Sequence, residues 1–163
     1  MADDILRIRT PIGIDYTWSS GPGAVGYMRG LENGKLLGRR CPGCQLVYFP
    51  PRNGLCPRCG VLLADEVEVG PRGTITTFCI VNVPFLGQTI KIPYVAATIL
   101  LDGADIGMQH LIQECEASEV RMGMRVEPIW RDKSQWTPSL ENIMYYKPTG
   151  EPDAEFDVYA RHL

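Results

Sequence analysis

The chain has 163 residues, a formal net charge of −3, 45% apolar residues and 21% charged residues, a composition typical of a globular protein. The negative charge argues against general attraction to nucleic acid, and no run of 18 apolar residues is present that would cross a membrane. Its first residues are acidic and lack the basic start and cleavage site of a signal peptide. We therefore expect a cytoplasmic protein whose six cysteines stay reduced.

Residues 1–22 are rich in Thr, Pro, Ser and Gly, and we expect them to form an arm that lies on another surface. From Ala24 to Leu37, apolar residues recur at roughly helical spacing, which predicts a helix. Arm and helix form an expected first unit, 1–38, followed by a cysteine-rich unit, 39–64.

After the cysteines the pattern changes to short stretches rich in β-branched residues, separated by turns that contain Gly, Pro or Asp. The predicted strands are Glu66–Val69, Thr74–Val83, Tyr94–Leu101, Ile106–Gln113 and Arg125–Trp130. Asp102-Gly103 indicates a tight turn, and Glu114–Met122 can form one helical turn that ends at Gly123. A mainly β fold with five strands and a short helix before the last strand is typical of a Greek-key barrel, expected here over 65–133.

Residues 134–163 form an expected C-terminal extension, in which aromatic residues alternate with acids. Such a segment is too polar for a core and too aromatic for a free linker, so we expect a tail that docks on a partner. Its aromatic residues are Trp136, Tyr145, Tyr146, Phe156 and Tyr159.

Two C-x2-C pairs, separated by 11 residues, predict one structural zinc ion per chain. The expected ligands are Cys41, Cys44, Cys56 and Cys59. Two residues between paired cysteines let one tight turn direct both sulfurs at one point. Pro42 and Pro57 restrict that turn, and Gly43 and Gly60 are expected to accept its unusual dihedral angles.

Two disulfides, or a redox-active dithiol, are the alternatives to zinc. A reducing compartment disfavours the first, and the presence of two matched pairs disfavours the second. Four thiolate ligands leave no open position for water or substrate, which makes the expected zinc structural rather than catalytic. The surrounding segment, 33–64, contains no acid but five basic residues: Lys35, Arg39, Arg40, Arg52 and Arg58. Their charge either offsets the thiolates or binds phosphates or an acidic partner, and both explanations stay open.

No set of nucleophile, base and orienting group is visible, so no residue is assigned a catalytic role. Cys79, in a predicted strand, is expected to be a buried apolar residue. Cys115 lies between Glu114 and Glu116, whose charges are expected to raise the pKa of its thiol. His110, also in a predicted strand, is interpreted as structural.

Several motifs in 25–131 resemble one known family. They are Gly34-Lys-Leu-Leu-Gly-Arg-Arg-Cys-Pro-Gly-Cys44, Tyr48-Phe-Pro-Pro-Arg52, Cys56-Pro-Arg-Cys-Gly60, Gly73-Thr-Ile75, Pro93-Tyr-Val95 and Val120-Arg-Met-Gly-Met-Arg-Val126. The chain resembles the acyl-CoA-associated zinc-ribbon/OB-fold family, formerly the domain of unknown function numbered thirty-five. This resemblance implies a rubredoxin-like zinc ribbon followed by a five-stranded OB-fold barrel.

The resemblance also implies a function as a non-catalytic subunit of a thiolase-like enzyme. Such a partner makes or breaks a carbon–carbon bond of an acyl-CoA, in the degradation of aromatic compounds or steroids. CoA is then expected only as part of the partner's substrate. The alternative is a nucleic-acid-binding protein, since zinc ribbons and OB-folds both serve that purpose. Against it, Thr74–Val83 and Tyr94–Leu101 are nearly free of charge, whereas binding single strands needs cations beside stacking rings. A free-standing enzyme is disfavoured because no catalytic set is visible.

Overall fold

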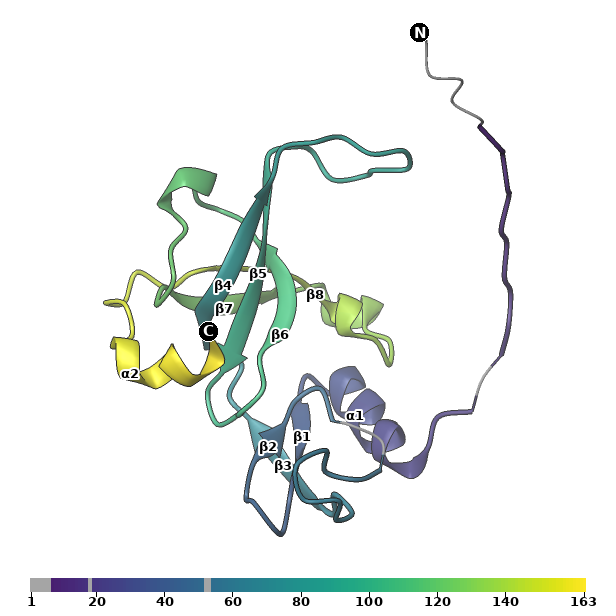
Figure 1. Ribbon diagram of the computed structural model, residues 1–163, viewed down its shortest axis with the longest axis vertical. Coiled ribbons are helices and arrows are strands. Elements are labelled where there is room, and N and C mark those ends of the chain that lie inside the picture. The colour runs from purple at the N-terminus through teal and green to yellow at the C-terminus, as the bar shows by residue number, and fades with distance from the viewer. Residues whose placement is uncertain (1–6, 18, 52–53) are drawn as a thin grey trace, which may run out of the picture.

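The computed structural model describes residues 7–17, 19–51 and 54–163. A small sheet with one helix leads into a barrel, and an extended N-terminal segment runs beside both (Figure 1). The helices and strands are α1 (Pro22–Glu32), β1 (Leu36–Arg40), β2 (Val47–Tyr48), β3 (Asp65–Val69), β4 (Gly73–Val81), β5 (Tyr94–Leu101), β6 (Met108–Ile112), β7 (Arg125–Trp130), β8 (Ile143–Pro148) and α2 (Phe156–Tyr159).

The first unit joins α1 to an antiparallel sheet in the order β2-β1-β3. Helix α1 ends earlier than its apolar spacing predicts, because Gly34 takes a positive φ of 69° and turns the chain back. Leu36, expected in the helix, instead begins β1 and is buried in the core. Strand β1 pairs over its whole length with β3, from Leu36 opposite Val69 to Arg40 opposite Asp65.

Among the described residues, the second unit is a closed barrel of five strands in the order β4-β5-β6-β8-β7. Strand β5 pairs antiparallel with both β4 and β6, and β7 pairs antiparallel with β8. Strands β6 and β8 are parallel and meet at one pair, Ile112 and Tyr146. The mainly β fold with a zinc-ribbon sheet and a five-stranded barrel is therefore confirmed.

The strands that form the barrel differ from those predicted. The stretch predicted as its first strand is β3, which pairs with β1 in the ribbon sheet. The fifth barrel strand is β8, which lies in the segment expected to be a docking tail. The barrel therefore does not end at residue 133. Polar residues before and after β8 hide the strand in the sequence pattern. In the structure its inward-facing Ile143 and Tyr146 are fully buried.

Two of the expected turns are confirmed. Gly103 takes a positive φ of 88° after Asp102 and ends β5. The helical turn expected in Glu114–Met122 is the short 3-10 helix η1 (Ala117–Glu119), and Gly123, also at φ 88°, lies beyond it. Within the part of the chain that the structure describes, no helix is both long and apolar enough to span a membrane.

One apolar core runs through both units. It joins Leu31 and Phe49 of the first unit to Ile99, Val126 and Tyr146 of the barrel.

Polar contacts reinforce this junction. The buried Asn142 side chain donates hydrogen bonds to the carbonyl oxygens of Leu31 at 3.0 Å and Thr137 at 2.7 Å. Asp105 accepts a hydrogen bond from the backbone of Val47 through its carboxylate, and donates one to Val47 through its own backbone, both at 2.9 Å. The ribbon and the barrel are therefore packed as one body.

Candidate metal centre

The two cysteine pairs fold into the same turn. In the first pair, the backbone N–H of Gln45 donates to the carbonyl of Cys41, and in the second that of Gly60 donates to Cys56. Gln45 and Gly60 occupy equivalent positions and take positive φ angles of 63° and 69°. Each turn thereby directs two sulfurs toward the same side of the ribbon.

Gly43 has a different role from the one expected. Among the described residues with positive φ, Gly60 is included but Gly43 is not, since the left-handed position of its turn belongs to Gln45. A Cβ atom at Gly43 would lie 3.4 Å from the sulfur of Cys59. Gly43 therefore lies where the two turns are in van der Waals contact, and a Cβ atom there would make an ordinary contact.

The four sulfurs lie in a geometry that fits one metal ion. The Sγ atoms of Cys41, Cys44, Cys56 and Cys59 all lie within 4.8 Å of one another, and those of Cys44 and Cys56 are 3.7 Å apart. A tetrahedral zinc ion with Zn–S bonds of about 2.3 Å separates its sulfur ligands by about 3.8 Å. All four cysteines are free rather than joined in disulfides. The donor set therefore suits zinc.

Tyr48 supports this cluster, although the sequence assigned it no role. Its buried hydroxyl lies 3.2 Å from the sulfur of Cys56. This hydrogen bond, together with burial, raises the pKa of Tyr48 to about 12, so the hydroxyl stays protonated and can donate to a thiolate. The position of Tyr48 between the two cysteine pairs is the feature of the sequence that could have predicted its hydrogen bond to a cysteine sulfur.

Hydrogen bonds also favour the thiolate form of Cys56. Burial raises the pKa of this thiol, but donation from Tyr48 and from the backbone N–H groups of Cys59 and Arg58 outweighs burial and lowers the pKa to about 6. In contrast, hydrogen bonding with Cys44 raises the pKa of Cys59 to about 12. Because metal ligation requires deprotonated sulfur, the bound cation itself must stabilise the remaining thiolates.

Two of the basic residues around the cysteines have local partners. Lys35 forms an ion pair with Glu68 at 3.3 Å, and Arg39 donates to the carbonyl of Leu63 at 3.0 Å. These contacts favour a structural role within the ribbon for both side chains. Arg52 lies outside the described residues.

Of the predictions for the two cysteines outside the cluster, one is wrong and one is confirmed. The prediction that Cys79 is buried is wrong, because it lies exposed on the far half of β4. The predicted direction is confirmed for Cys115, whose pKa is raised by burial first and by the charges of Glu119 and Glu116 second.

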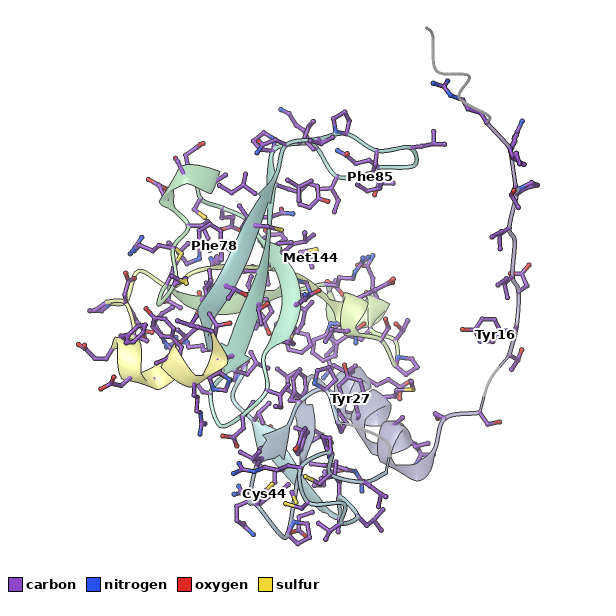
Figure 2. The ribbon with its side chains drawn as sticks, viewed as in Figure 1. Tyr16, Tyr27, Cys44, Phe78, Phe85 and Met144 are labelled. Carbon is purple, nitrogen blue, oxygen red and sulfur yellow. The ribbon has the colours of Figure 1, made fainter. Side chains whose placement is uncertain are left out.

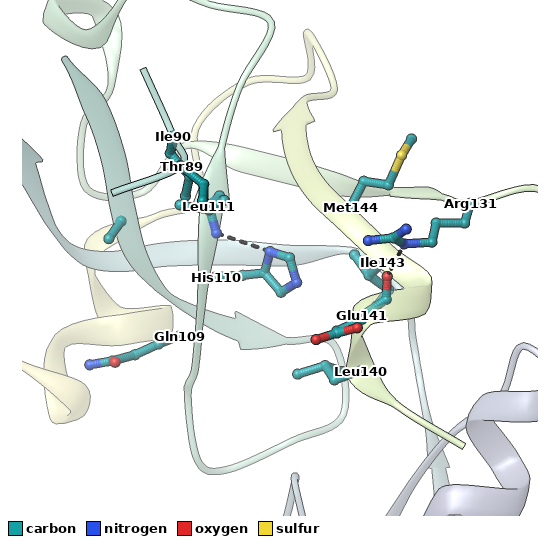
Figure 3. A pocket seen from close by; sticks show the side chains of 11 residues that line it. Thr89, Ile90, Gln109, His110, Leu111, Arg131, Leu140, Glu141, Ile143 and Met144 are labelled. Atoms are coloured by element: carbon teal, nitrogen blue, oxygen red, sulfur yellow. Dashed lines mark hydrogen bonds between the residues drawn. The ribbon is translucent and has the colours of Figure 1, made fainter. Parts of the chain in front are cut away.

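His110 lines a cavity of about 650 Å³ at the seam where β6 and β8 diverge (Figure 3). Its Nδ1 accepts a hydrogen bond from the backbone N–H of Leu111 at 2.9 Å, and burial lowers its pKa. Arg131 also lines this cavity, and its Nε donates a hydrogen bond to the carbonyl oxygen of Glu141. The hydrogen bond to Nδ1 and the partial burial of the ring support the interpretation of His110 as a structural residue.

Family profiles match the chain in two parts. Residues 28–62 match "ChsH2, rubredoxin-like zinc ribbon domain", and residues 66–131 match "ChsH2, C-terminal OB-fold domain". Two curated relatives are both described as "DUF35 domain-containing scaffold protein". The relative from Methanocaldococcus jannaschii is 37% identical over 59% of this chain and 67% of its own length. That from Pyrococcus furiosus is 29% identical over 61% of this chain and 71% of its own length.

Solved structures share the fold. A chain described as "Ltp2-ChsH2(DUF35) aldolase" has a TM-score of 0.59 and 20% identity, and the match covers 81% of this chain and 98% of the other. A DUF35 protein of unknown function from Sulfolobus solfataricus has a TM-score of 0.60 and 18% identity, over 79% of this chain and 87% of the other. The protein belongs to the DUF35 family, with a ChsH2-type zinc ribbon followed by a ChsH2-type OB-fold domain.

Proposed function

We propose that this chain is a non-catalytic, zinc-binding accessory subunit of a thiolase-like acyl-CoA enzyme. The partner makes or breaks a carbon–carbon bond of an acyl-CoA by thiolysis, Claisen condensation or retro-aldol cleavage, in the degradation of aromatic compounds or steroids. This chain stabilises the partner and helps to shape its substrate entrance, and CoA takes part only within the partner's substrate. The cytoplasm, where thiols stay reduced, is its proposed location.

The observation that carries this proposal is a four-cysteine cluster in a family whose curated members are described as scaffold proteins. Four thiolates fill a tetrahedral zinc ion and leave no position for substrate, so the metal serves folding. The description of one structural neighbour combines a DUF35 chain with an aldolase, which supports a catalytic partner for this chain too.

Nucleic-acid binding, the alternative, is less well supported. Strands β4, β5 and β6 contain no Lys or Arg. Single-strand binding needs a cationic groove beside aromatic rings, and its affinity falls steeply with salt. We therefore expect no detectable binding of single-stranded DNA or RNA at physiological salt.

Metal analysis tests the zinc centre. We expect the purified chain to contain about one zinc per molecule, as a closed four-cysteine site predicts. Cys41→Ser should lose the metal and unfold the ribbon, because structural zinc contributes about 10 kcal/mol or more to such folds. Cys79→Ser, at an exposed cysteine outside the cluster, is the matched control and should keep its metal. Full metal content in Cys41→Ser would contradict the assignment.

Isolation of the complex tests the partner. The tagged chain is expressed in its native host, and co-purifying proteins are identified by mass spectrometry. The identified thiolase-like protein is then produced with and without this chain and assayed with acyl-CoA substrates. We expect a stable complex, no turnover by this chain alone, and reduced solubility or activity of the partner alone. Turnover by the isolated chain, or a partner that is equally soluble and active without it, would contradict the proposal.

A further inference from the structure

The four cysteines of the metal centre are unequally accessible. Cys41 and Cys56, the first cysteine of each pair, are buried, with 0% and 1% of their surface exposed. Cys44 is half-buried and Cys59 is exposed. Figure 2 shows Cys44 at the ribbon end of the molecule, away from the barrel. A metal ion bound by these four sulfurs therefore has an inner side that faces the ribbon core and an outer side that faces solvent.

The inner side is a small apolar cluster of its own. Cys41 and Cys56 pack with the buried Tyr48 and Leu63, and Ile106 of the barrel packs against them. Side chains in such a cluster fill the space around one another, so none of them moves without displacing its neighbours. The sulfurs of Cys41 and Cys56 are therefore held in place by packing as well as by their turns.

Tyr48 adds a directed contact to the inner side. Its backbone pairs with Arg39 of β1, and its ring is buried, so the position of its hydroxyl is fixed. Among the described residues, the sulfur of Cys56, at 3.2 Å, is the one hydrogen-bond partner of this hydroxyl. A metal-bound thiolate carries no proton, so the hydroxyl must be the donor. Without this acceptor, a buried hydroxyl would be left without a partner, which costs free energy.

Cys59 lies on the outer side without comparable support. Among the described residues, no backbone N–H or hydroxyl group donates a hydrogen bond to its sulfur, whereas that of Cys41 accepts one from the backbone N–H of Cys44 at 3.4 Å. At Gly60, the next residue, nothing lies within 4 Å of the place where a Cβ would be. Solvent and small reagents therefore reach Cys59 without displacing packed side chains.

We propose that the zinc centre has a fixed inner side and a reactive outer side. Tyr48 is a positioning residue that donates a hydrogen bond to the zinc-bound thiolate of Cys56 and holds it as an anchor, and Cys59 is the ligand that electrophiles modify first. This inference rests on the zinc centre of the proposed function and is independent of the partner.

The modification at Cys59 is a simple addition when the electrophile is a maleimide. The thiolate sulfur forms a bond to one carbon of the double bond, and the other carbon takes a proton from water. The product is a neutral thioether, which is no longer a thiolate ligand. Modification of Cys59 therefore leaves three thiolates and weakens the hold on the metal.

Removal of one hydroxyl group tests the anchor. Tyr48→Phe keeps the buried ring, and zinc affinity is measured on the full chain by competition with a chelator. We expect Tyr48→Phe to bind zinc about 10-fold more weakly, as loss of a hydrogen bond to a metal ligand predicts. Tyr27→Phe is the matched control. Tyr27 lies on α1, where its ring packs edge-on against Phe49 rather than on a cysteine, so its zinc affinity should be unchanged (Figure 2).

Cobalt substitution distinguishes the hydrogen bond from a general loosening of the ribbon. Co²⁺ bound to thiolates gives sulfur-to-metal charge-transfer bands, whose energy falls as the sulfur becomes richer in electrons. Tyr48→Phe removes a donor from Cys56, so the bands should move to lower energy, whereas Tyr27→Phe should leave them in place. At saturating metal, circular dichroism should show the same fold for wild type and both variants.

Alkylation tests the outer ligand. The zinc-loaded Cys79→Ser chain, which lacks the exposed cysteine outside the cluster, is treated with limiting N-ethylmaleimide. Trypsin cleaves after Arg58 and so places Cys56 and Cys59 in different peptides, which mass spectrometry quantifies. We expect Cys59 to be modified before Cys56, and a metallochromic dye to detect zinc release in step with modification of Cys59.

The outcomes separate this inference from the proposed function. In a wild-type chain that holds one zinc, an unchanged affinity and an unchanged cobalt spectrum of Tyr48→Phe would overturn the role of Tyr48. Modification of Cys56 before Cys59 would overturn the assignment of the outer ligand. Both results would leave the proposed function standing. Absence of zinc from the wild-type chain would overturn the inference and the zinc centre of the proposed function together.

Discussion

The two ends of this chain look alike in sequence but differ in structure. Both contain apolar residues within polar surroundings, and both are predicted to be arms for a partner. The C-terminal segment instead supplies strand β8 and places Tyr146 in the core, fully buried. The N-terminal arm remains outside, with Ile12 81% exposed. The difference lies in what each end pairs with: β8 pairs along β7 and meets β6 at Ile112, which completes the barrel, whereas the arm pairs with no strand among the described residues.

Truncation should separate the two ends most strongly. Deletion of 137–163 removes β8 and with it the buried Ile143 and Tyr146. Each such side chain is worth about 2–5 kcal/mol, against a total stability of about 5–15 kcal/mol, so the remaining chain should not fold. Deletion of 1–17 should leave the melting temperature of the isolated chain unchanged. Circular dichroism and thermal denaturation measure both, and a cooperatively folded 1–136 fragment would contradict the comparison.

Substitution of one tyrosine in each end tests the same difference between a buried and an exposed segment. Tyr146→Ala should lower the free energy of unfolding by about 3–5 kcal/mol because it empties a core position. Tyr16→Ala, at an exposed position of the arm, should change it by about 0.5 kcal/mol or less. Urea denaturation measures both values.

Tyr146→Phe sharpens the test. The buried Tyr146 hydroxyl has no hydrogen-bond partner among the described residues, so its removal should be neutral or stabilising. A large loss of stability in Tyr146→Phe would mean that the hydroxyl is bonded.

Asn142 links the C-terminal segment to α1, and its removal should have an intermediate effect. Asn142→Ala leaves the carbonyl of the buried Leu31 without its donor and removes a part-buried bond to the carbonyl of Thr137, at an expected cost of about 1–3 kcal/mol in the free energy of unfolding. Asn82→Ala is the control, since its one hydrogen bond, to Ile80, is exposed. Equal stability of the two variants would show that this link does not hold the C-terminal segment in place.

Gly34 and Gly150 give the smallest expected difference between two variants. Gly34 and Gly150 both take positive φ angles, 69° and 78°, so alanine strains the backbone at either position by about 1 kcal/mol. A Cβ at Gly34 would also lie 2.7 Å from the Trp136 ring, whereas nothing lies within 4 Å at Gly150. Gly34→Ala should therefore lose about 1 kcal/mol more than Gly150→Ala in chemical denaturation. Equal losses of stability in the two variants would show that the Trp136 ring moves aside without an energetic cost.

Local patterns determined much of what the sequence predicts correctly. The spacing within each cysteine pair places both sulfurs on one turn, because only a few bonds separate them. Strands β5 and β7 match their predicted bounds, and the turn at Gly103 lies where Asp102-Gly103 indicates it. Each of these features depends on neighbours close along the chain, which a single sequence contains.

Tertiary packing decided the rest. Whether Asp65–Val69 or Ile143–Pro148 joins the barrel depends on which strand edges remain open after the others have paired. The bond from Tyr48 to Cys56 and the exposure of Cys79 likewise follow from how distant segments meet. An alternating apolar stretch shows that a strand can form, but the surface that β8 covers lies elsewhere in the chain, and only the tertiary structure shows where.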